Sequence, residues 1–187
     1  MKKRLVVGMT GASGVPLAIA LLQAVRTFPE WETHAVCSDS FLTTMCAETE
    51  LEPDSIRTIA HYVYEPRDIA AAISSGTFHT EGMVVVPCSM KTLAGIANGF
   101  SDNLILRAAD VTIKERRRLV LAARESPLSP IHLRNMLSLA QLGVTILPPV
   151  LTYYNRPESI EDMTNHIVGK ILAEFGMDLP AFRRWKS

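Results

Sequence analysis

The stretch LVVGMTGASG, at residues 5–14, decides the fold. It begins with a short apolar run, Leu5–Met9, and ends in a turn of small residues. A helical pattern then runs from Val15 to Thr27, with Pro16 in the first turn, where proline is tolerated. A strand that leads into a helix through a glycine-rich turn is typical of the first unit of a parallel α/β sheet.

The same order repeats along the rest of the chain. Further apolar runs lie at 34–37, 83–87, 119–123 and 144–147, and a weaker one lies at 61–64. Their continuous apolar character favours parallel strands that are buried on both faces. The alternation predicts an α/β fold with a doubly wound, Rossmann-like (flavodoxin-like), mostly parallel sheet and helices on both faces.

Two later helices have clear patterns. The helix at 131–142 is expected to stop at Gly143 and to bury a set of apolar residues: Ile131, Met136, Leu137, Ala140 and Leu142. The last helix, at about 159–175, has Ser159 as a candidate cap and acidic residues in its first turn. We therefore expect a single domain over residues 1–187 that ends in this helix and a short tail.

Composition excludes several classes of protein. Nineteen Lys and Arg residues balance 19 Asp and Glu residues, so the net charge predicts neither nucleic-acid binding nor attraction to an anionic membrane. Three cysteines without C-x-x-C spacing speak against a disulfide framework and a structural zinc site. Leu5–Met9 is too short for a secretion signal, and no apolar run approaches a membrane span, so we expect a cytoplasmic protein.

In such folds ligands bind beyond the carboxyl ends of the strands, so the residues that follow each strand matter most. The turn at 10–14 fits either a phosphate site or a plain tight turn, and it matches neither the Walker loop nor the G-x-G-x-x-G fingerprint. Asp39 fits either a ribose-binding acid or a helix N-cap. Ser89 and Thr92 are spaced to cap a helix and to offer two hydroxyls.

Charged residues suggest an anion site. Arg107 and Lys114 lie two helical turns apart on one face, which fits either a solvated surface or joint contact with one anion. Arg124 and Glu125 follow a strand together. A stiff double-proline segment then presents Tyr153 and Tyr154, which fit either a site or a packed aromatic lid.

Together these segments resemble the flavin prenyltransferase family, the UbiX-like proteins that are also described as the small subunit of phenolic-acid decarboxylases. The resemblance runs nearly end to end. Its motifs are TGASG at 10–14, ET at 48–49, ISSG at 73–76, PCSMKTLA at 87–94, RAADV at 107–111, KERR at 114–117, RESPL at 124–128, IHLRNML at 131–137 and YNRPES at 154–159.

The resemblance implies a flavoprotein in which reduced FMN is the co-substrate and prenylated FMN the product. The donor is dimethylallyl phosphate, and a UbiD-type decarboxylase receives the product. The family likeness further implies a homo-oligomer, a dodecamer, with sites shared between subunits. No acidic cluster for Mg²⁺ is visible, so cationic side chains are expected to take the place of a metal.

The resemblance also assigns roles to residues. The residues that hold the flavin are Gly11, Ala12, Ser13, Ser38, Ser89, Met90, Lys91, Thr92 and Arg124. Those that surround the substrate phosphate are Arg107, Lys114, Glu125, Tyr154 and Lys170, and the catalytic set is Ser13, Glu48, Glu125 and Tyr154. The chain departs from the family pattern at Asp39, where members often carry Lys, and at Lys170, where some carry Arg.

Three other functions compete with this one. An FMN-dependent oxidative decarboxylase of a cysteinyl substrate shares the fold. The members of that family, however, carry a motif that resembles Pro-Ala-Ser-Ala-Asn where this chain has PCSMK at 87–91. An NAD(P)-linked short-chain reductase requires Tyr-x-x-x-Lys, which no tyrosine of this chain provides. A non-catalytic flavin-carrying subunit of a decarboxylase is the third.

Overall fold

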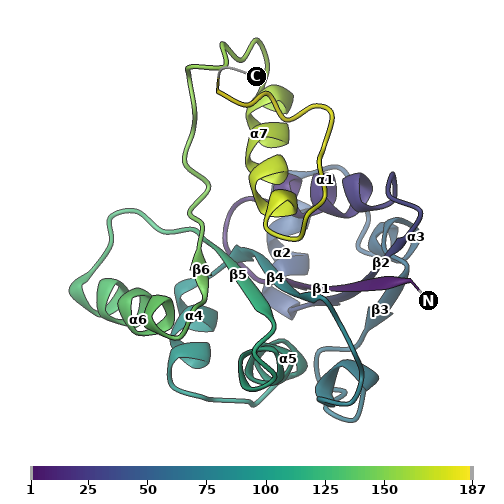
Figure 1. Cartoon of the computed structure of the whole chain (residues 1–187), viewed down its shortest axis with the longest axis vertical. Helices are drawn as coiled ribbons and strands as arrows, with labels where there is room; N and C mark the ends of the chain where they lie inside the picture. The colour runs from purple at the N-terminus through teal and green to yellow at the C-terminus, as the bar shows by residue number, and fades with distance from the viewer. Residues whose placement is uncertain (1, 186–187) are drawn as a thin grey trace.

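The computed structural model describes residues 2–185, and within them six strands form one parallel sheet (Figure 1). The strand order is β3-β2-β1-β4-β5-β6, with the switch between β1 and β4 that is typical of Rossmann folds. The strands are β1 (Lys3–Met9), β2 (Trp31–Cys37), β3 (Tyr62–Tyr64), β4 (Gly82–Cys88), β5 (Arg118–Ala123) and β6 (Thr145–Ile146). The predicted doubly wound fold is confirmed, and every predicted run contributes to a strand.

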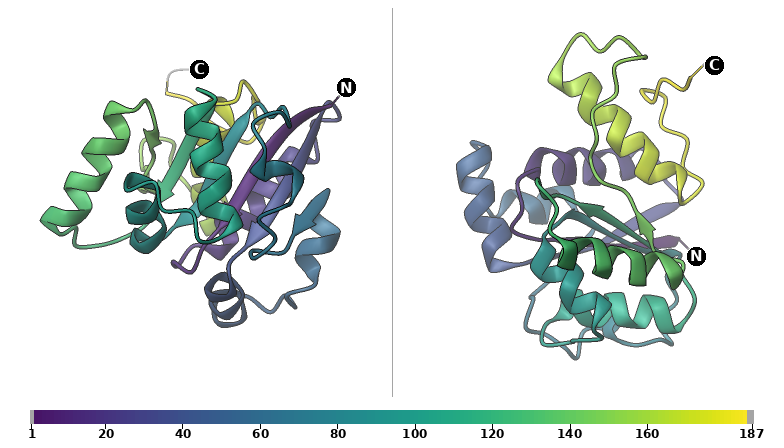
Figure 2. Two further views of the ribbon diagram at one scale, coloured as in Figure 1. Left: turned by 90° about the horizontal axis from the view of Figure 1, so that it is seen from below. Right: turned by 90° about the vertical axis from the view of Figure 1, so that its left-hand side faces the viewer.

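Helices cover both faces of the sheet, as the two views of Figure 2 show. One layer contains α1 (Val15–Val25), α2 (Asp39–Glu48), α3 (Ser55–Ile59) and α7 (Ile160–Ala173). The other contains α4 (Met90–Ala97), α5 (Leu104–Lys114), α6 (Pro130–Gln141) and a 3₁₀ turn, η1 (Ala72–Ser74).

The central strand β4 explains the continuous apolar runs of the sequence. Val84 and Val86 pack in the core under α1, whereas Met83 and Val85 pack in the core beside α5. Successive side chains of a strand point to opposite faces, so a strand with helices on both sides needs apolar residues at every position.

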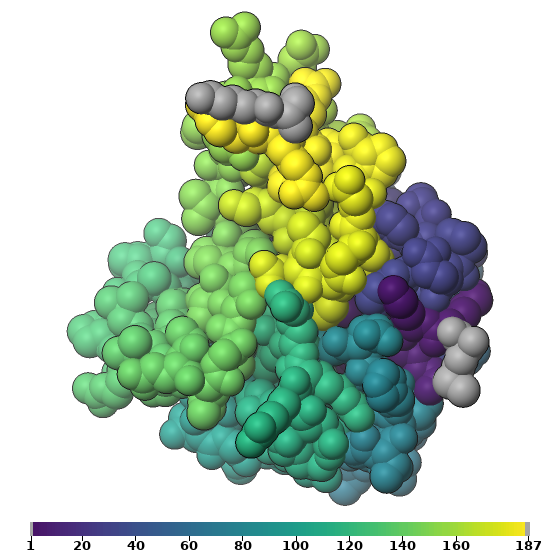
Figure 3. Space-filling view, in the orientation of Figure 1, coloured from purple at the N-terminus to yellow at the C-terminus, as the bar shows by residue number. Residues whose placement is uncertain are grey.

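The predicted burial of the α6 residues is wrong. Ile131 is 63% exposed, Leu137 60% and Leu142 64%, Ala140 is also exposed and Met136 is only partly buried. The reason is the position of α6 at the edge of the sheet, where it packs on α4 and on the two-residue strand β6. The helix projects from the body in Figures 1 and 3. We call Ile131, Leu133, Leu137 and Leu142 the α6 apolar face.

The chain between β6 and α7, residues 147–159, forms an extended arm that leads away from the sheet (Figures 1 and 3). Val150, Leu151 and Tyr153 on this arm are exposed. The helix expected at about 159–175 runs from Ile160 to Ala173 and packs on α1. Within residues 2–185, no helix has the length and apolar character needed to cross a membrane.

Candidate functional site

Thr10 joins the ends of the two strands at the switch in strand order. Its backbone N–H and its hydroxyl both donate to the carbonyl of Pro87, at 3.2 and 2.8 Å. The same hydroxyl accepts a hydrogen bond of 2.9 Å from the N–H of Ser89. The turns that follow β1 and β4 are therefore fixed side by side, in the place where ligands bind in doubly wound folds.

The turn after β2 lies against the turn after β1. Ser38 donates its N–H to the carbonyl of Met9 at 3.0 Å, and its hydroxyl caps α2 by accepting from the N–H of Phe41 at 3.1 Å. The N-cap suggested for Asp39 thus lies one residue earlier. A Cβ at Gly11 would lie 2.4 Å from Cβ of Ser40, so this close approach requires glycine.

The turns after β4 and β5 complete the arrangement. The Ser89 hydroxyl caps α4, as predicted, by accepting from the N–H of Thr92 at 3.3 Å. Arg124 donates its N–H to the carbonyl of Cys88 at 3.0 Å, and its side chain is exposed. Burial raises the pKa of the Cys88 thiol to about 12, so this thiol is no nucleophile at neutral pH. We call the set formed by residues 10–14, 38–40, 89–92 and Arg124 the edge cluster.

Glu48 supplies an anion to this cluster from the last turn of α2. Its Oε2 accepts from the N–H groups of Gly14 and Val15, at 2.9 and 2.8 Å, and so caps the N-terminus of α1, where Gly14 has no side chain to do so. Burial raises the pKa of Glu48, but hydrogen bonds from the Ser13 hydroxyl and these two N–H groups outweigh burial and lower the pKa overall. The anion at this helix N-terminus is therefore a carboxylate of the chain itself.

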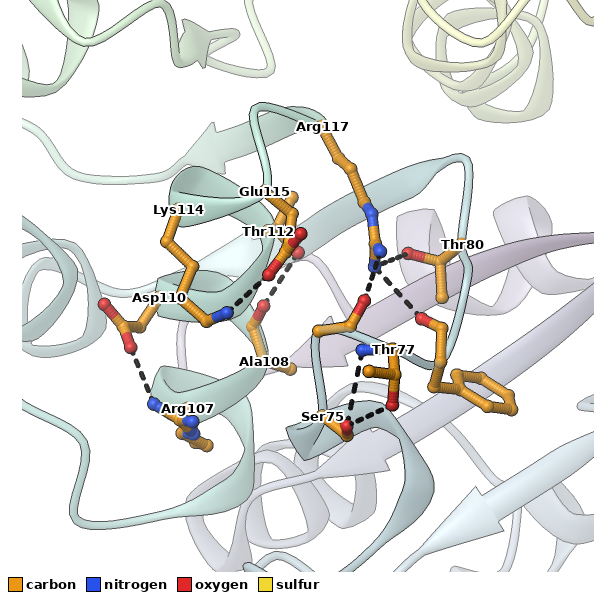
Figure 4. Close-up of polar contacts among 12 residues, drawn as sticks. Ser75, Thr77, Thr80, Arg107, Ala108, Asp110, Thr112, Lys114, Glu115 and Arg117 are labelled. Carbon is orange, nitrogen blue, oxygen red and sulfur yellow. Dashed lines mark hydrogen bonds and ion pairs between the residues drawn. The ribbon is translucent and has the colours of Figure 1, made fainter.

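Arg107 and Lys114 lie on α5, in the other helical layer (Figure 4). Arg107 pairs with Asp110 at 2.8 Å, and Lys114 pairs with Glu115. A Cβ at Gly76 would meet both Lys114 and Glu115, so the ISSG segment packs closely under this pair. Each cation thus has an acidic partner within this chain.

Tyr154 and Lys170 come from the arm and from α7. The Tyr154 hydroxyl lies 3.5 Å from Nε2 of His166, and its ring packs edge-on against Trp185. Lys170 is exposed and lines a cavity of about 310 Å³ between α7 and the start of the arm. Its positive charge lies one helical turn from His166.

One chain therefore brings together only part of the predicted site. The proposed flavin residues and Glu48 meet at one edge of the sheet. Lys114 precedes the first residue of β5, whereas Arg124 and Glu125 follow its last residue. A strand of six residues spans about 20 Å, so Lys114 and Arg124 lie near opposite ends of the strand.

Three residues of the arrangement were assigned no role from the sequence, although Thr10 and Asn155 lie within the TGASG and YNRPES motifs. Thr10 joins two turns, and Asn155 and His166 lie beside Tyr154. A lone histidine within an amphipathic helix reads as an ordinary core residue. Its spacing relative to Tyr154 becomes informative only once the arm is seen to fold back along α7.

Comparison with known proteins identifies the relatives of this chain. The family model described as Flavoprotein matches residues 1–172. A probable UbiX-like flavin prenyltransferase from Sedimentibacter hydroxybenzoicus is 50% identical over 184 residues, which cover 98% of this chain and 97% of that protein.

Solved structures agree closely with this fold. A dodecameric FMN-dependent UbiX-like decarboxylase from Escherichia coli O157:H7 has a TM-score of 0.96 and 51% identity, over 98% of this chain and 100% of that one. AnUbiX (PadA1), solved with FMN and dimethylallyl pyrophosphate, has a TM-score of 0.97 and 50% identity, over 100% and 99% of the two chains. The peptidyl-cysteine decarboxylase EpiD, at 19% identity and a TM-score of 0.62 over 81% of this chain and 84% of that one, shares the fold alone.

Proposed function

We propose that this chain, which belongs to the flavoprotein family and within it to the UbiX-like flavin prenyltransferases, joins a dimethylallyl group from dimethylallyl phosphate to N5 and C6 of reduced FMN. The observation that carries the proposal is identity of about half over nearly the whole chain with flavin prenyltransferases. The cysteine decarboxylases, by contrast, share only the fold.

The edge cluster fits FMN. The hydroxyls of Ser38 and Ser89 stand at the N-termini of α2 and α4, beside the exposed Arg124, so hydroxyl donors and a fixed positive charge are available to one phosphate and one ring system. Gly11 keeps this surface free of side-chain bulk. When bound, reduced FMN supplies the ring atoms that accept the C5 unit. By the family likeness, the residues that hold it are Gly11, Ala12, Ser13, Ser38, Ser89, Met90, Lys91, Thr92 and Arg124.

The cationic residues stabilise the departing phosphate. Cleavage of the allylic C–O bond leaves negative charge on the phosphate oxygen, and Arg107, Lys114 and Lys170 lower the barrier by stabilising that charge. Tyr154 donates a hydrogen bond to the phosphate, and Glu125 orients the cations around it. A metal is not required, because these side chains provide the positive charge.

Glu48 is suited to proton transfer. Its lowered pKa keeps it ionised at neutral pH, and Oε2 is engaged by two backbone N–H groups. Oε1, which accepts the longer 3.2 Å bond from the N–H of Gly14, is the oxygen that takes up the proton, with Ser13 beside the carboxylate. The departing phosphate is the alternative acceptor.

The complete site requires more than one copy of the chain. Within one chain Lys114 lies near the end of β5 opposite to the edge cluster, and the exposed α6 apolar face and arm offer apolar surface for contacts between copies. We therefore propose a homo-oligomer, a dodecamer, in which neighbouring copies complete each site. The dodecameric relative from Escherichia coli O157:H7 supports this arrangement.

The product, prenylated FMN, passes to a UbiD-type decarboxylase in this proposal. The family likeness is its support. The cytoplasmic location stays a prediction from the sequence.

The test is an anaerobic incubation of the protein with reduced FMN and either dimethylallyl phosphate or dimethylallyl diphosphate. Mass spectrometry should detect a flavin heavier by one C5 unit, and EDTA should not prevent its formation. A bound flavin whose mass never changes with either donor would indicate a carrier subunit. The same result together with decarboxylation of a cysteinyl peptide would support the oxidative decarboxylase instead.

A further inference from the structure

Three polar side chains form a line where the arm folds back on α7. His166, which is 2% exposed, stands between Asn155 and Tyr154. Nδ2 of Asn155 lies 3.5 Å from Nδ1 of His166, and Nε2 of His166 lies 3.5 Å from the Tyr154 hydroxyl oxygen. Both distances exceed the usual range of about 2.7–3.2 Å and mark loose contacts, as is common for site residues before a ligand binds.

The roles of these groups follow from their chemistry. A side-chain amide nitrogen only donates, so the Asn155 amide that faces Nδ1 requires Nδ1 to be the unprotonated, accepting nitrogen. Neutral imidazole then carries its proton on Nε2, and that N–H donates to the tyrosine oxygen. The hydroxyl proton of Tyr154 is left free for another acceptor.

We propose that Asn155 and His166 are positioning residues that hold the Tyr154 hydroxyl with its proton directed to the phosphate of the dimethylallyl substrate. Donation then runs in one direction, from Asn155 through His166 and Tyr154 to a phosphate oxygen. This inference rests on the proposed function, because only there is Tyr154 assigned to the substrate phosphate.

The surroundings keep His166 neutral, as this direction of donation requires. Burial lowers the pKa of His166, and the positive charge of Lys170 lowers it further. A protonated imidazole would place an N–H on both nitrogens and set a donor against the Asn155 amide.

The C-terminal tail fixes the ring in place. Phe182 packs edge-on against His166, with 5.1 Å between the ring centroids. It also lies over Gly169, where an added Cβ would be 2.4 Å from the Cβ of Phe182. Trp185 packs against the other partner, Tyr154, at 5.1 Å. The tail thus packs against both the imidazole and the phenol ring. This packing limits the side-chain rotamers by which the Tyr154 hydroxyl could move away from His166.

The opposite orientation of the Asn155 side-chain amide would reverse the direction of hydrogen-bond donation along these three residues. Oδ1 of Asn155 is buried without a hydrogen-bond partner among the described residues, and turning the amide would set it against an N–H on Nδ1. Tyr154 would then donate to Nε2 and lose its proton for the phosphate. The tautomer of His166 therefore separates the two arrangements.

The first test measures that tautomer without any turnover. The chain has five histidines, so solid-state NMR of protein labelled with ¹⁵N-histidine gives few signals, and the signal absent from His166→Phe is that of His166. We expect a neutral ring protonated on Nε2 at pH 7. A ring protonated on Nδ1, or on both nitrogens, would overturn the proposal.

The second test separates a positioning role from a structural one. His166→Phe keeps a ring but removes the donor, and should raise the KM for dimethylallyl phosphate about tenfold with kcat nearly unchanged. His166→Gln restores an N–H near the Nε2 position and should recover most of the loss. In a Tyr154→Phe background, His166→Phe should add little, because the two act through one hydroxyl.

Two outcomes contradict the proposal: equal losses in His166→Phe and His166→Gln, or losses that multiply in the double variant. Failure of the proposed function has a different signature, because the tautomer of His166 can be measured even in a wild-type chain that never forms prenylated flavin. In that case the tautomer alone decides whether the line of donors exists.

Discussion

At the edge cluster each turn is tied to its neighbour by hydrogen bonds within one chain, whereas the arm and α6 present apolar side chains that no residue between 2 and 185 covers. Thr10, Ser38 and Arg124 each bond to the residue that ends an adjacent strand or follows it. Leu137 and Tyr153, in contrast, are more than half exposed. The first region is organised before any partner arrives, and the second is the surface that the proposed assembly would cover. Changes in the two regions should therefore fail in different ways.

The largest effect should come from Gly11→Ala, in the preorganised region. The new Cβ would lie 2.4 Å from Cβ of Ser40 and 2.9 Å from its backbone carbon, so the turn must move. We expect FMN affinity to fall at least about a hundredfold, since the moved turn displaces several hydrogen-bond donors at once, each worth about 1 kcal/mol. Flavin absorbance after gel filtration measures the loss.

A compensating change sharpens this test. Ser40→Gly alone should retain FMN. In the double variant with Gly11→Ala, it removes the clash with the Ser40 side chain, while the contact with the backbone carbon at 2.9 Å remains. Partial recovery in the double variant is therefore expected. If Gly11→Ala binds FMN normally, the turn is not part of the flavin site.

The next effect concerns the α6 apolar face, which the proposed assembly would cover. Leu133→Glu combined with Leu137→Glu places two charges on the α6 apolar face, and burying either in an interface is costly. Sedimentation should show smaller particles, and prenylation should fall by about tenfold or more, while each copy stays folded. Ser138→Glu adds a charge to an exposed polar position of the same helix and should leave the assembly intact. An active monomer would contradict the shared site.

The smallest effect tests the link between Glu48 and α1. Glu48→Gln should retain the flavin but form product slowly, and at neutral pH it should lower the free energy of unfolding by about 1–2 kcal/mol through loss of the helix-terminal charge. The folded-state pKa of Glu48 is lower than its ordinary 4.5. Its stabilisation is therefore complete above pH 4.5 and is lost as the pH falls through the folded pKa.

Urea unfolding at several pH values measures this contribution. The difference in free energy of unfolding between the wild type and Glu48→Gln should be constant near neutral pH and should disappear under acid conditions. Exposed Glu50→Gln is the control. A gap that widens in acid would mean that the carboxylate does not cap α1 as described.

The sequence predicted the strands, and the bounds of α1, α6 and α7 to within two residues, because their signals are local. Continuous apolar runs marked the strands, and Ser89 and Ser159 were recognised as caps from their spacing. The environment of α6 was misjudged because helical spacing of apolar residues identifies a face to be covered, but not the molecule that covers it. The role of Glu48 as a cap has no local signal in the sequence, because its partners lie 33 and 34 residues earlier in the chain.

Since Glu48 is tethered to the chain, it competes with dissolved anions for the N-terminus of α1 at an effective concentration on the order of millimolar or higher. Inorganic phosphate and free nucleotides must displace a carboxylate that loses no translational entropy on binding. A glycine-rich turn that would otherwise attract any phosphate is in this way kept from indiscriminate occupancy. Anion selectivity at this end of the sheet thus follows from one side chain that occupies the N–H groups of Gly14 and Val15 beforehand.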